Sequence, residues 1–206
     1  MKDFFRKTLY NLGIILVSPL LIPFFLTTEK EIIDADVKRW VNVFGWKGES
    51  NLGNLLSLLD RQKEFRNLYY HRLFKGNLSA RIFMYLLSYF YKSCPYLFID
   101  TSSNFGPGLF IQHGFSTIVM ADMGENCWIN QQVTIGYRDK TSRPKIGDNV
   151  RITAGAKVIG GVTIGNNVTV GANAVVVKNV PDNCVVVGVP AYIVKKNGIK
   201  VKEELV

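Results

Sequence analysis

The sequence predicts a mainly β protein: a parallel β-helix of hexapeptide repeats, preceded by a helical N-terminal region with a hydrophobic segment. Residues 146–181 divide into six consecutive hexads, each of which begins with Ile or Val. The fourth residue is always Gly or Asn, which enter the left-handed backbone region at low cost, and the fifth is Val or Ala. A β-branched residue, a corner and a small residue, repeated in this order, are typical of a chain that turns after each short strand of a parallel β-helix.

The same frame extends backwards along the chain. Its inward positions fall on Ile99, Phe105, Ile111, Thr117, Met123, Ile129 and Ile135, and its corner position falls on Gly108, Gly114 and Asn126. Eleven residues separate Ile135 from Ile146 where six are expected. A five-residue insertion within 137–145 is therefore predicted to leave the coil as a loop.

We expect four segments in the 206 residues. They are a hydrophobic, membrane-associated segment (1–28), a helical region (29–97), the β-helix (98–194) and a basic C-terminal tail (195–206), which we expect to be a solvated end. The leucines of 52–59 lie at helical spacing, and 65–73 and 80–91 form two further helical runs that end before Pro95.

Residues 8–26 are almost entirely apolar and follow Lys2, Arg6 and Lys7. The segment is just long enough to span a bilayer. If it did, the positive-inside rule would keep the basic N-terminus in the cytoplasm and place the β-helix on the other side of the membrane. Pro19 and Pro23 also interrupt the helix. We therefore expect a re-entrant or interfacial segment on the cytoplasmic face of the cell membrane. Burial against the protein's own core or a trimer partner is the alternative.

The net charge of +9 predicts an anionic partner. No Arg/Lys-rich helix or basic stripe with aromatic residues is present, so nucleic acid is not expected. Cys94, Cys127 and Cys184 are odd in number and lack metal-ligand spacing. We expect them to be reduced core thiols of a cytosolic protein. No metal site is predicted.

Two histidines are present, and they differ in setting. His71 lies within a helical run and is expected to be structural. His113 is the third residue of the hexad 111–116, at a corner where side chains point away from the core. An imidazole there can accept a proton from a bound hydroxyl group.

Several segments carry a resemblance to the serine acetyltransferase family of hexapeptide acyltransferases, and more closely to its relatives in capsule and exopolysaccharide gene clusters. They are 105–114 (FGPGLFIQHG), 131–136 (QQVTIG), 143–148 (RPKIGD), 155–160 (GAKVIG) and 187–191 (VGVPA). The likeness covers about half of the chain, roughly 100–194. It implies a left-handed coil, homotrimers with active sites between subunits, and acetyl-CoA as the acyl donor.

The resemblance also implies roles for single residues. His113 matches the catalytic histidine, which takes the proton of the acceptor hydroxyl while the oxygen attacks the thioester. Ala154 and Ala172 match positions that line the pantetheine arm, and Tyr137 matches a glycine that contacts it. The CoA phosphates need cations, for which the candidates are Lys157, Lys178, Lys195 and Lys196.

Two departures from the family pattern bear on the acceptor. Gln112 replaces an Asp that precedes the catalytic histidine, and Arg143 replaces a histidine that precedes the Pro-Lys-Ile-Gly element. Loss of the carboxylate removes the partner of serine's ammonium group, whereas Gln112 and Arg143 suit sugar hydroxyls. We therefore expect an O-acetyltransferase that acts on a sugar of a surface polysaccharide or its lipid-linked precursor.

Other functions remain open at this point. The alternatives are a serine O-acetyltransferase of cysteine biosynthesis, an enzyme that N-acetylates an amino sugar, and a non-catalytic β-helix scaffold.

Overall fold

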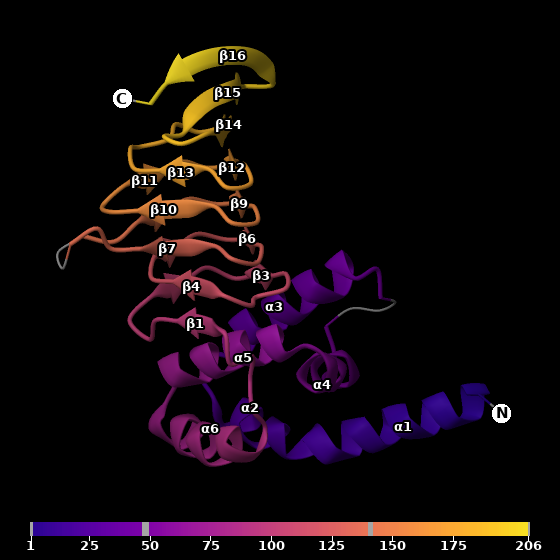
Figure 1. Cartoon of the computed structure of the whole chain (residues 1–206). Helices are drawn as coiled ribbons and strands as arrows, with labels where there is room; N and C mark the ends of the chain where they lie inside the picture. Colours follow the sequence, from indigo (N-terminus) through magenta and orange to yellow (C-terminus); the bar gives the residue numbers. More distant parts are fainter. Residues whose placement is uncertain (1, 47–49, 140–141, 206) are drawn as a thin grey trace. The chain divides into compact units, whose positions relative to one another are not determined.

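The structure, a computed structural model, describes residues 2–46, 50–139 and 142–205 (Figure 1). Lys140 and Thr141 of the predicted loop, and the side chains of Lys2, Arg6 and Lys7, lie outside the described part. The chain divides into two compact units, Met1–Cys94 (unit 1) and Pro95–Val206 (unit 2).

Unit 1 is helical, as the sequence predicts. Its elements are α1 (Lys2–Val17), the 3₁₀ helix η1 (Ser18–Leu20), α2 (Leu21–Leu26), α3 (Lys30–Val43), α4 (Leu52–Arg61), α5 (Lys63–Lys75) and α6 (Leu78–Phe90). Pro19 lies in the first turn of η1, and the Ser18 hydroxyl donates to the carbonyl of Ile15 at 2.8 Å. The apolar segment is therefore interrupted at Ser18-Pro19, because proline cannot continue the hydrogen-bond ladder of α1.

The core of unit 1 combines apolar side chains with a few buried polar groups. Trp40, Phe65 and Leu68 are almost completely buried. Within this core Arg72 Nε donates to Asp36 Oδ2 at 2.8 Å, and both side chains are buried. His71 is only 6% exposed on α5, which supports the structural role expected for it.

Unit 2 is a parallel β-helix whose short strands form three sheets (Figure 1). Sheet A contains β1 (Leu97–Ile99), β4 (Thr117–Val119), β7 (Thr134–Gly136), β10 (Lys157–Ile159) and β13 (Val175–Val176). Sheet B contains β2 (Asn104–Phe105), β5 (Asp122–Met123), β8 (Lys145–Ile146) and β11 (Thr163–Ile164). Sheet C contains β3 (Phe110–Ile111), β6 (Trp128–Ile129), β9 (Arg151–Ile152), β12 (Thr169–Val170), β14 (Cys184–Val187), β15 (Tyr192–Lys196) and β16 (Ile199–Glu204).

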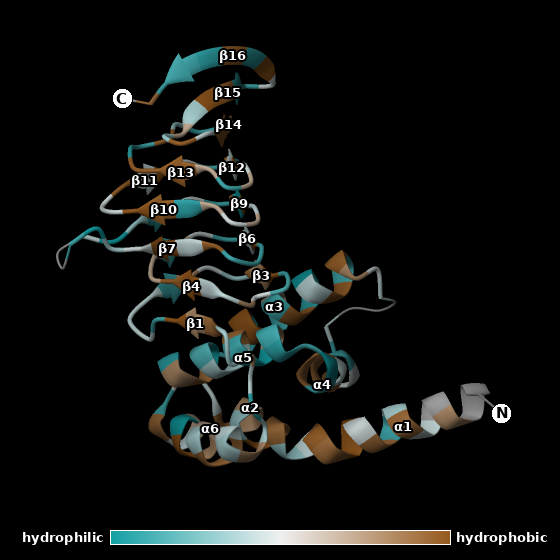
Figure 2. Cartoon of the chain, in the orientation of Figure 1, coloured by the Kyte–Doolittle hydropathy of each residue, from teal (hydrophilic) through white to brown (hydrophobic). Residues whose placement is uncertain are grey.

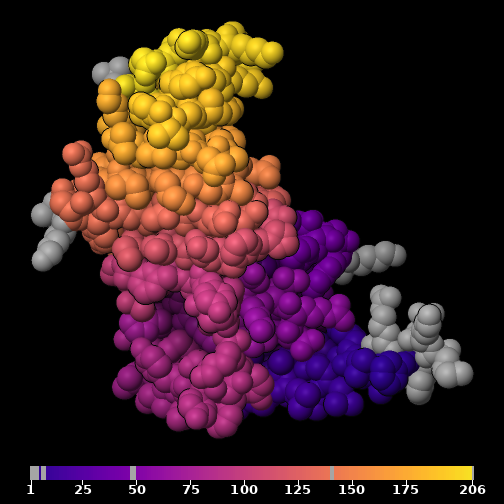
Figure 3. Space-filling model, viewed as in Figure 1, coloured from indigo at the N-terminus to yellow at the C-terminus, as the bar shows by residue number. Residues whose placement is uncertain are grey.

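Each strand of the coil pairs in parallel with the strand one turn later in the same sheet, as β1 does with β4 and β4 with β7. The hexad residues predicted to face inward are buried, for example Ile129, Ile152 and Val170. In the space-filling view the turns of unit 2 lie directly on one another (Figure 3). The predicted β-helix of hexapeptide repeats after a helical region is thus confirmed.

Left-handed corners occur at most of the predicted positions. Gly108, Gly155, Asn126, Asn149, Asn167 and Asn173 all have positive φ angles. Two turns differ: His113 (φ 52°) and Ser116 (φ 54°) are left-handed in place of Gly114, and Gly160 (φ 94°) is left-handed in place of Gly161. There the carbonyls of His113 and Gly160 accept hydrogen bonds from the residues two positions later, both at 2.8 Å, which tightens the corner.

A ladder of side chains supports the corners between sheets B and C. The amides of Glu125, Asp148 and Asn166 donate to side-chain oxygens one turn later, at 2.7–2.8 Å. The residue before each donor is a glycine, and a Cβ at Gly147 would overlap Asn166 Oδ1. The glycines at these hexad positions therefore make room for the side chain of the next turn.

The basic C-terminal segment is structured, in contrast to the solvated end expected. β15 pairs antiparallel with β14, and β16 pairs antiparallel with β15. Lys196 forms an ion pair with Glu203 at 2.9 Å across this hairpin. Residues 199–202 alternate between apolar and basic side chains and are followed by two glutamates, which suits an exposed edge strand.

Candidate functional site

The predicted site residues lie on different corners of the coil. We call the turns from sheet C to sheet A the His113 corner; they comprise 112–116, 130–133, 153–156 and 171–174. The turns from sheet A to sheet B form the Arg143 corner, which includes 100–103, 120–121 and the loop 137–144. Within one chain these two corners lie at opposite ends of the strands of sheet A.

His113 is exposed on its corner, two residues beyond the end of β3. Its left-handed backbone, with φ 52°, is uncommon for a residue with a Cβ atom, although histidine is among the side chains that tolerate it best. Among the described residues of one chain, no hydrogen bond reaches its imidazole ring. The ring is thus presented to solvent from a tightly turned part of the backbone.

Two amide side chains flank His113 on the same corner. Asn130 Nδ2 donates to Gln112 Oε1 at 3.0 Å, which links two successive turns of the coil. Lys157 Nζ donates to the carbonyl of Gln132 at 2.6 Å, one turn further along. Asn130 was not predicted from the sequence; the only signal was the polar run 130–132 at a corner one repeat after His113.

Ala154 and Ala172 lie on the His113 corner, two and three turns beyond His113. The amide of Asn173 donates to the carbonyl of Ala154 at 3.0 Å, so the two turns are stacked directly. With an inter-strand spacing of about 4.8 Å, the three steps from the turn of His113 to that of Ala172 span roughly 14 Å. The small side chains of Ala154 and Ala172 leave the backbone of these two turns accessible to a narrow ligand.

An apolar recess of about 460 Å³ adjoins the His113 corner. It is lined by Tyr96, Phe98, Phe115 and Ile118 together with Pro95, Ser116 and Thr117. Phe115 and Ser116 belong to the same turn as His113, so the recess borders that residue along the chain. Sequence reasoning missed this recess, because Phe98 and Ile118 occupy outward positions of the hexads.

Arg143 acts as a clamp where the inserted loop returns to the coil. Its Nε and Nη2 donate to the two carboxylate oxygens of Asp122 at 3.0 and 2.7 Å. Nη1 donates to the Ser102 hydroxyl at 2.8 Å, and Nη2 also donates to the Ser102 carbonyl at 3.2 Å. Burial is the largest single influence and lowers the pKa of Arg143, but hydrogen bonding and charge attraction to Asp122 and Tyr137 together raise the pKa overall. The guanidinium group therefore holds the loop.

The other candidate cofactor residues are not gathered around His113 within one chain. Tyr137 begins the loop of the Arg143 corner. Lys178 follows β13 on the same corner, where its Nζ donates to the carbonyl of Leu205 at 2.9 Å. Lys195 lies on β15 beside Val185, towards the end of sheet C that is remote from the His113 corner.

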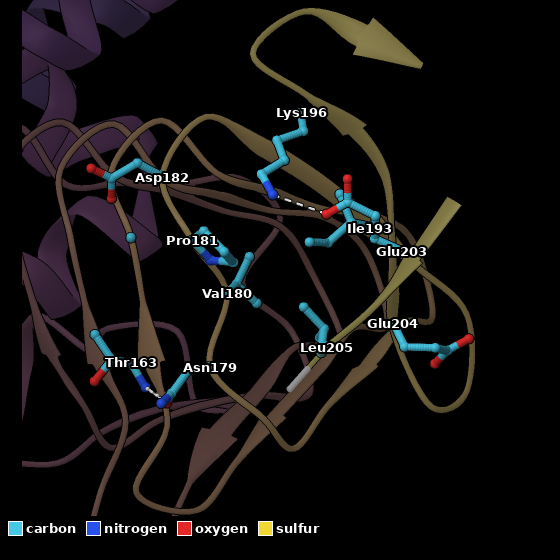
Figure 4. A pocket seen from close by; sticks show the side chains of 11 residues that line it. Thr163, Asn179, Val180, Pro181, Asp182, Ile193, Lys196, Glu203, Glu204 and Leu205 are labelled. Atoms are coloured by element: carbon cyan, nitrogen blue, oxygen red, sulfur yellow. Dashed lines mark hydrogen bonds and ion pairs between the residues drawn. The ribbon is translucent and has the colours of Figure 1, made fainter. Parts of the chain in front are cut away.

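A second cavity, of about 470 Å³, lies beneath the C-terminal hairpin (Figure 4). Its polar groups are paired with one another: Lys196 with Glu203, and the amide of Thr163 with Asn179 Oδ1 at 2.8 Å. The candidate phosphate ligand Lys196 is thus engaged by a carboxylate. None of the residues of the His113 corner lines this cavity.

The cysteines fit the expectation of reduced core thiols. All three are free, and Cys127 and Cys184 are buried. Burial raises the pKa of the Cys127 thiol to about 11, so the thiolate needed for nucleophilic or metal chemistry is scarce at neutral pH. Within residues 2–46, 50–139 and 142–205, no group of three His, Cys, Asp or Glu side chains is placed to hold a metal ion.

Comparison with known proteins identifies relatives of this chain. A family model described as bacterial transferase hexapeptide (six repeats) matches residues 143–178. A serine acetyltransferase of Staphylococcus aureus is 38% identical over 108 residues, which are 50% of this chain and 51% of that protein. The chain thus spans about half the length of the curated relatives it matches.

Solved structures extend the similarity over most of the chain. The Neisseria gonorrhoeae serine acetyltransferase in complex with serine is 31% identical, with a TM-score of 0.63, over 79% of this chain and 68% of that one. The Brucella abortus serine acetyltransferase in complex with coenzyme A is 26% identical, with a TM-score of 0.64, over 88% of this chain and 72% of that one.

These relatives correct the expected acceptor, a sugar of a surface polysaccharide or of its lipid-linked precursor. The similar proteins are serine acetyltransferases, so the assignment to capsule and exopolysaccharide enzymes was wrong. The physical argument failed at Arg143, because its guanidinium is occupied by Asp122 and Ser102 and is not free to receive sugar hydroxyls. By fold, repeat and identity, the chain belongs to the serine acetyltransferase family of hexapeptide-repeat transferases.

Proposed function

We propose that this protein is a serine O-acetyltransferase of cysteine biosynthesis, with acetyl-CoA as its acyl donor and His113 as its general base. The observation that carries the proposal is the exposed imidazole of His113 at one end of a stacked corner of small residues. It occurs in a chain that is 31% identical to a serine acetyltransferase whose structure contains serine.

In the proposed reaction, the imidazole of His113 takes the proton of the serine hydroxyl as the oxygen attacks the thioester carbonyl. The bond from the acetyl carbon to sulfur then breaks, and the CoA thiolate leaves and takes the proton from the imidazolium of His113. The products are O-acetylserine and CoA. Direct transfer needs a general base but no nucleophilic side chain. His113 can supply that base.

The donor is proposed to lie along the His113 corner. Ala154 and Ala172 offer backbone groups to the amides of a pantetheine arm, within the span of roughly 14 Å set by the coil spacing. Lys157 lies on the same side, and its ammonium group donates to the Gln132 carbonyl at 2.6 Å. The thioester end of the arm would then lie next to His113.

The site is proposed to be completed by a second copy of the chain. His113 and Tyr137 lie at opposite ends of the strands of sheet A, so one chain cannot bring both to one acyl donor. A cyclic trimer places one corner of a subunit against a different corner of its neighbour, since head-to-tail interfaces join unlike surfaces. Tyr137 would then serve the His113 site of the adjacent subunit.

Acceptor specificity tests the proposal. Purified full-length protein is mixed with acetyl-CoA and one acceptor, and release of the CoA thiol is followed. The acceptors are L-serine, L-serine methyl ester, 3-hydroxypropionate and a methyl glucoside. We expect transfer to L-serine at the highest kcat/KM, with O-acetylserine as the product. Equal rates with and without L-serine, or transfer to the glucoside alone, would refute the proposal.

A further inference from the structure

Unit 1 exposes large apolar side chains along one set of helices. Figure 2 shows hydrophobic residues along α1, α2 and α6. The side chains that are more than half exposed are Phe5, Leu9, Leu12, Ile15, Leu16, Phe25, Leu78, Tyr85, Leu86, Tyr89 and Phe90. We call this set the apolar platform. Soluble monomers rarely expose contiguous apolar surface on this scale, so the platform indicates a binding surface.

Helix α6 is apolar on its outer side. Its buried residues are only Ala80 and Met84, whereas Leu78 (71%), Leu86 (60%) and Phe90 (75%) are exposed. A helix that served only the core of unit 1 would place its larger apolar side chains inward. The outer face of α6 is therefore suited to an apolar environment outside the unit.

Helix α1 contributes a continuous stripe to the platform. Phe5, Leu9, Leu12 and Leu16 are exposed at the spacing of one helical face. Its other side is attached to α4: the Tyr10 hydroxyl is hydrogen-bonded to Ser57 at 2.8 Å, and Arg61 lies over the Tyr10 ring at 4.5 Å. A Cβ at Gly13 would come within 2.8 Å of Asp60 Oδ2, so the two helices are closely packed.

The three helices form one surface within unit 1. α2 packs against α6, and the Tyr91 hydroxyl at the end of α6 donates to the carbonyl of Leu16 at 2.8 Å. At the other end of α6, Asn77 Nδ2 donates to the carbonyl of Leu26 at 2.9 Å. α1 and α2 are thereby fixed to α6, and their apolar faces are held together.

The charged residues of α6 and its end, Arg81 and Lys92, are both basic. No charged residue occurs between Lys7 and Glu29, and Arg81 is the only charged residue of α6. Lys92 follows α6, and its ammonium group lies 4.6 Å from the centre of the Tyr89 ring. Tyrosines beside a lysine at the border of an apolar face are typical of a membrane–water interface.

We propose that the apolar platform binds the surface of an anionic lipid membrane, with α1, α2 and α6 lying in the plane of the interface. The segment Thr8–Leu26 has a mean hydropathy of 2.0 and is long enough to cross a bilayer. Its contacts with α4 and α6 favour an in-plane position, because crossing would break them and leave the polar groups of Ser57 and Asp60 without these neighbours. The inference does not depend on the proposed activity.

Flotation with vesicles tests the inference on the full chain. Vesicles of phosphatidylcholine alone are compared with an equal mixture of phosphatidylcholine and phosphatidylglycerol, at low and high salt. The variants are Ile15→Glu (68% exposed) and Leu86→Glu (60% exposed). Ile199→Glu on β16 is the matched control, since Ile199 is 69% exposed but belongs to unit 2. Circular dichroism checks that every variant is folded.

We expect the wild type and Ile199→Glu to float with the mixed vesicles, and less so at high salt. Ile15→Glu and Leu86→Glu should each weaken binding on the order of tenfold, because a carboxylate must leave water and faces anionic lipid. Absence of flotation, or equal flotation of all variants, would overturn the inference. The inference would also be overturned if the platform variants changed only the oligomeric mass of the protein in lipid-free solution. That result would indicate that a second copy of the chain covers this surface.

Discussion

At the scale of single residues, the backbone at His113 departs from what the hexad pattern predicts. The pattern predicts a left-handed Gly114, but His113 and Ser116 take this conformation instead, at a cost of roughly 1–2 kcal/mol for each L-residue. The turn is two residues longer than a regular hexad corner, because Val119 rather than Thr117 pairs with Ile135 of the next turn. Strained residues of this kind are often found where a side chain must be held for chemistry.

Gln112 provides a prediction on serine binding. Its Oε1 accepts a hydrogen bond from Asn130, and an aspartate at this position could keep that bond while adding a charge next to His113. We expect Gln112→Asp to lower the KM for L-serine by about tenfold, because a carboxylate attracts the ammonium group of the acceptor. Steady-state kinetics with and without that ammonium group, using 3-hydroxypropionate, measure the effect.

Gln132→Asp is the matched control for this change. Gln132 lies on the same corner, one turn further along the coil, and its side chain is exposed. Its backbone carbonyl accepts a hydrogen bond from Lys157. Its substitution should leave the KM for L-serine unchanged. Equal effects of both substitutions would show that only the general charge of the corner matters.

At the scale of elements, the coil was predictable because its hexads repeat a local requirement. An inward Ile or Val and a corner Asn or Gly recur in each turn, and the strands pair as this pattern demands. The clamp of Arg143 on Asp122 and Ser102 was not predictable, because it joins residues that are far apart in sequence across an insertion. The C-terminal hairpin was not predicted either, since a basic segment at the end of a chain is typical of a solvated end.

The glycine ladder leads to a prediction on stability. In Gly147→Ala, the added Cβ would overlap Asn166 Oδ1, which accepts a hydrogen bond from the amide of Asp148. We expect the substitution to lower the free energy of unfolding by about 1–3 kcal/mol, through overpacking and loss of that bond. Chemical denaturation monitored by circular dichroism measures it.

Gly136→Ala serves as the control in the same unit. Its Cβ would lie 3.7 Å from Met120 Sδ, an ordinary contact distance. Its unfolding free energy should stay close to that of the wild type. A cost at Gly136 as large as at Gly147 would contradict the account of the ladder.

The buried ion pair of unit 1 gives a second prediction for the elements. In Asp36→Ala, the guanidinium of Arg72 loses the carboxylate that it contacts at 2.8 Å inside the core. We expect a loss of about 3–5 kcal/mol in unfolding free energy. The double variant Asp36→Leu with Arg72→Met should recover most of it, because no buried charge is left. A double variant as unstable as Asp36→Ala would contradict this explanation.

At the scale of the whole molecule, the sequence predicted the two kinds of structure in their order. Helices occupy unit 1 and the coil occupies unit 2, which meet between Cys94 and Pro95. The acceptor was misjudged because it was inferred from two side chains, Gln112 and Arg143, whose partners come from other turns of the coil. A single sequence also does not reveal how copies of the chain complete a site.

Complementation between chains tests the proposed sharing of the site. His113→Asn chains, expected to be nearly inactive, and Tyr137→Ala chains, expected to bind acetyl-CoA more weakly, are unfolded together and refolded as mixed trimers. If each site takes His113 from one copy and Tyr137 from its neighbour, about a quarter of the sites in an equal mixture regain both residues. Mixtures no more active than either variant alone would show that each chain builds its own site.

The most direct test of the central claim is the rate of acetyl transfer to L-serine by the wild type and by His113→Asn. Asparagine tolerates the left-handed backbone of this position, so the variant removes the base and keeps the corner. We expect kcat to fall on the order of a hundredfold or more, with the KM for acetyl-CoA nearly unchanged. A His113→Asn variant as fast as the wild type, or a wild type that transfers no acetyl group to L-serine, would contradict the account.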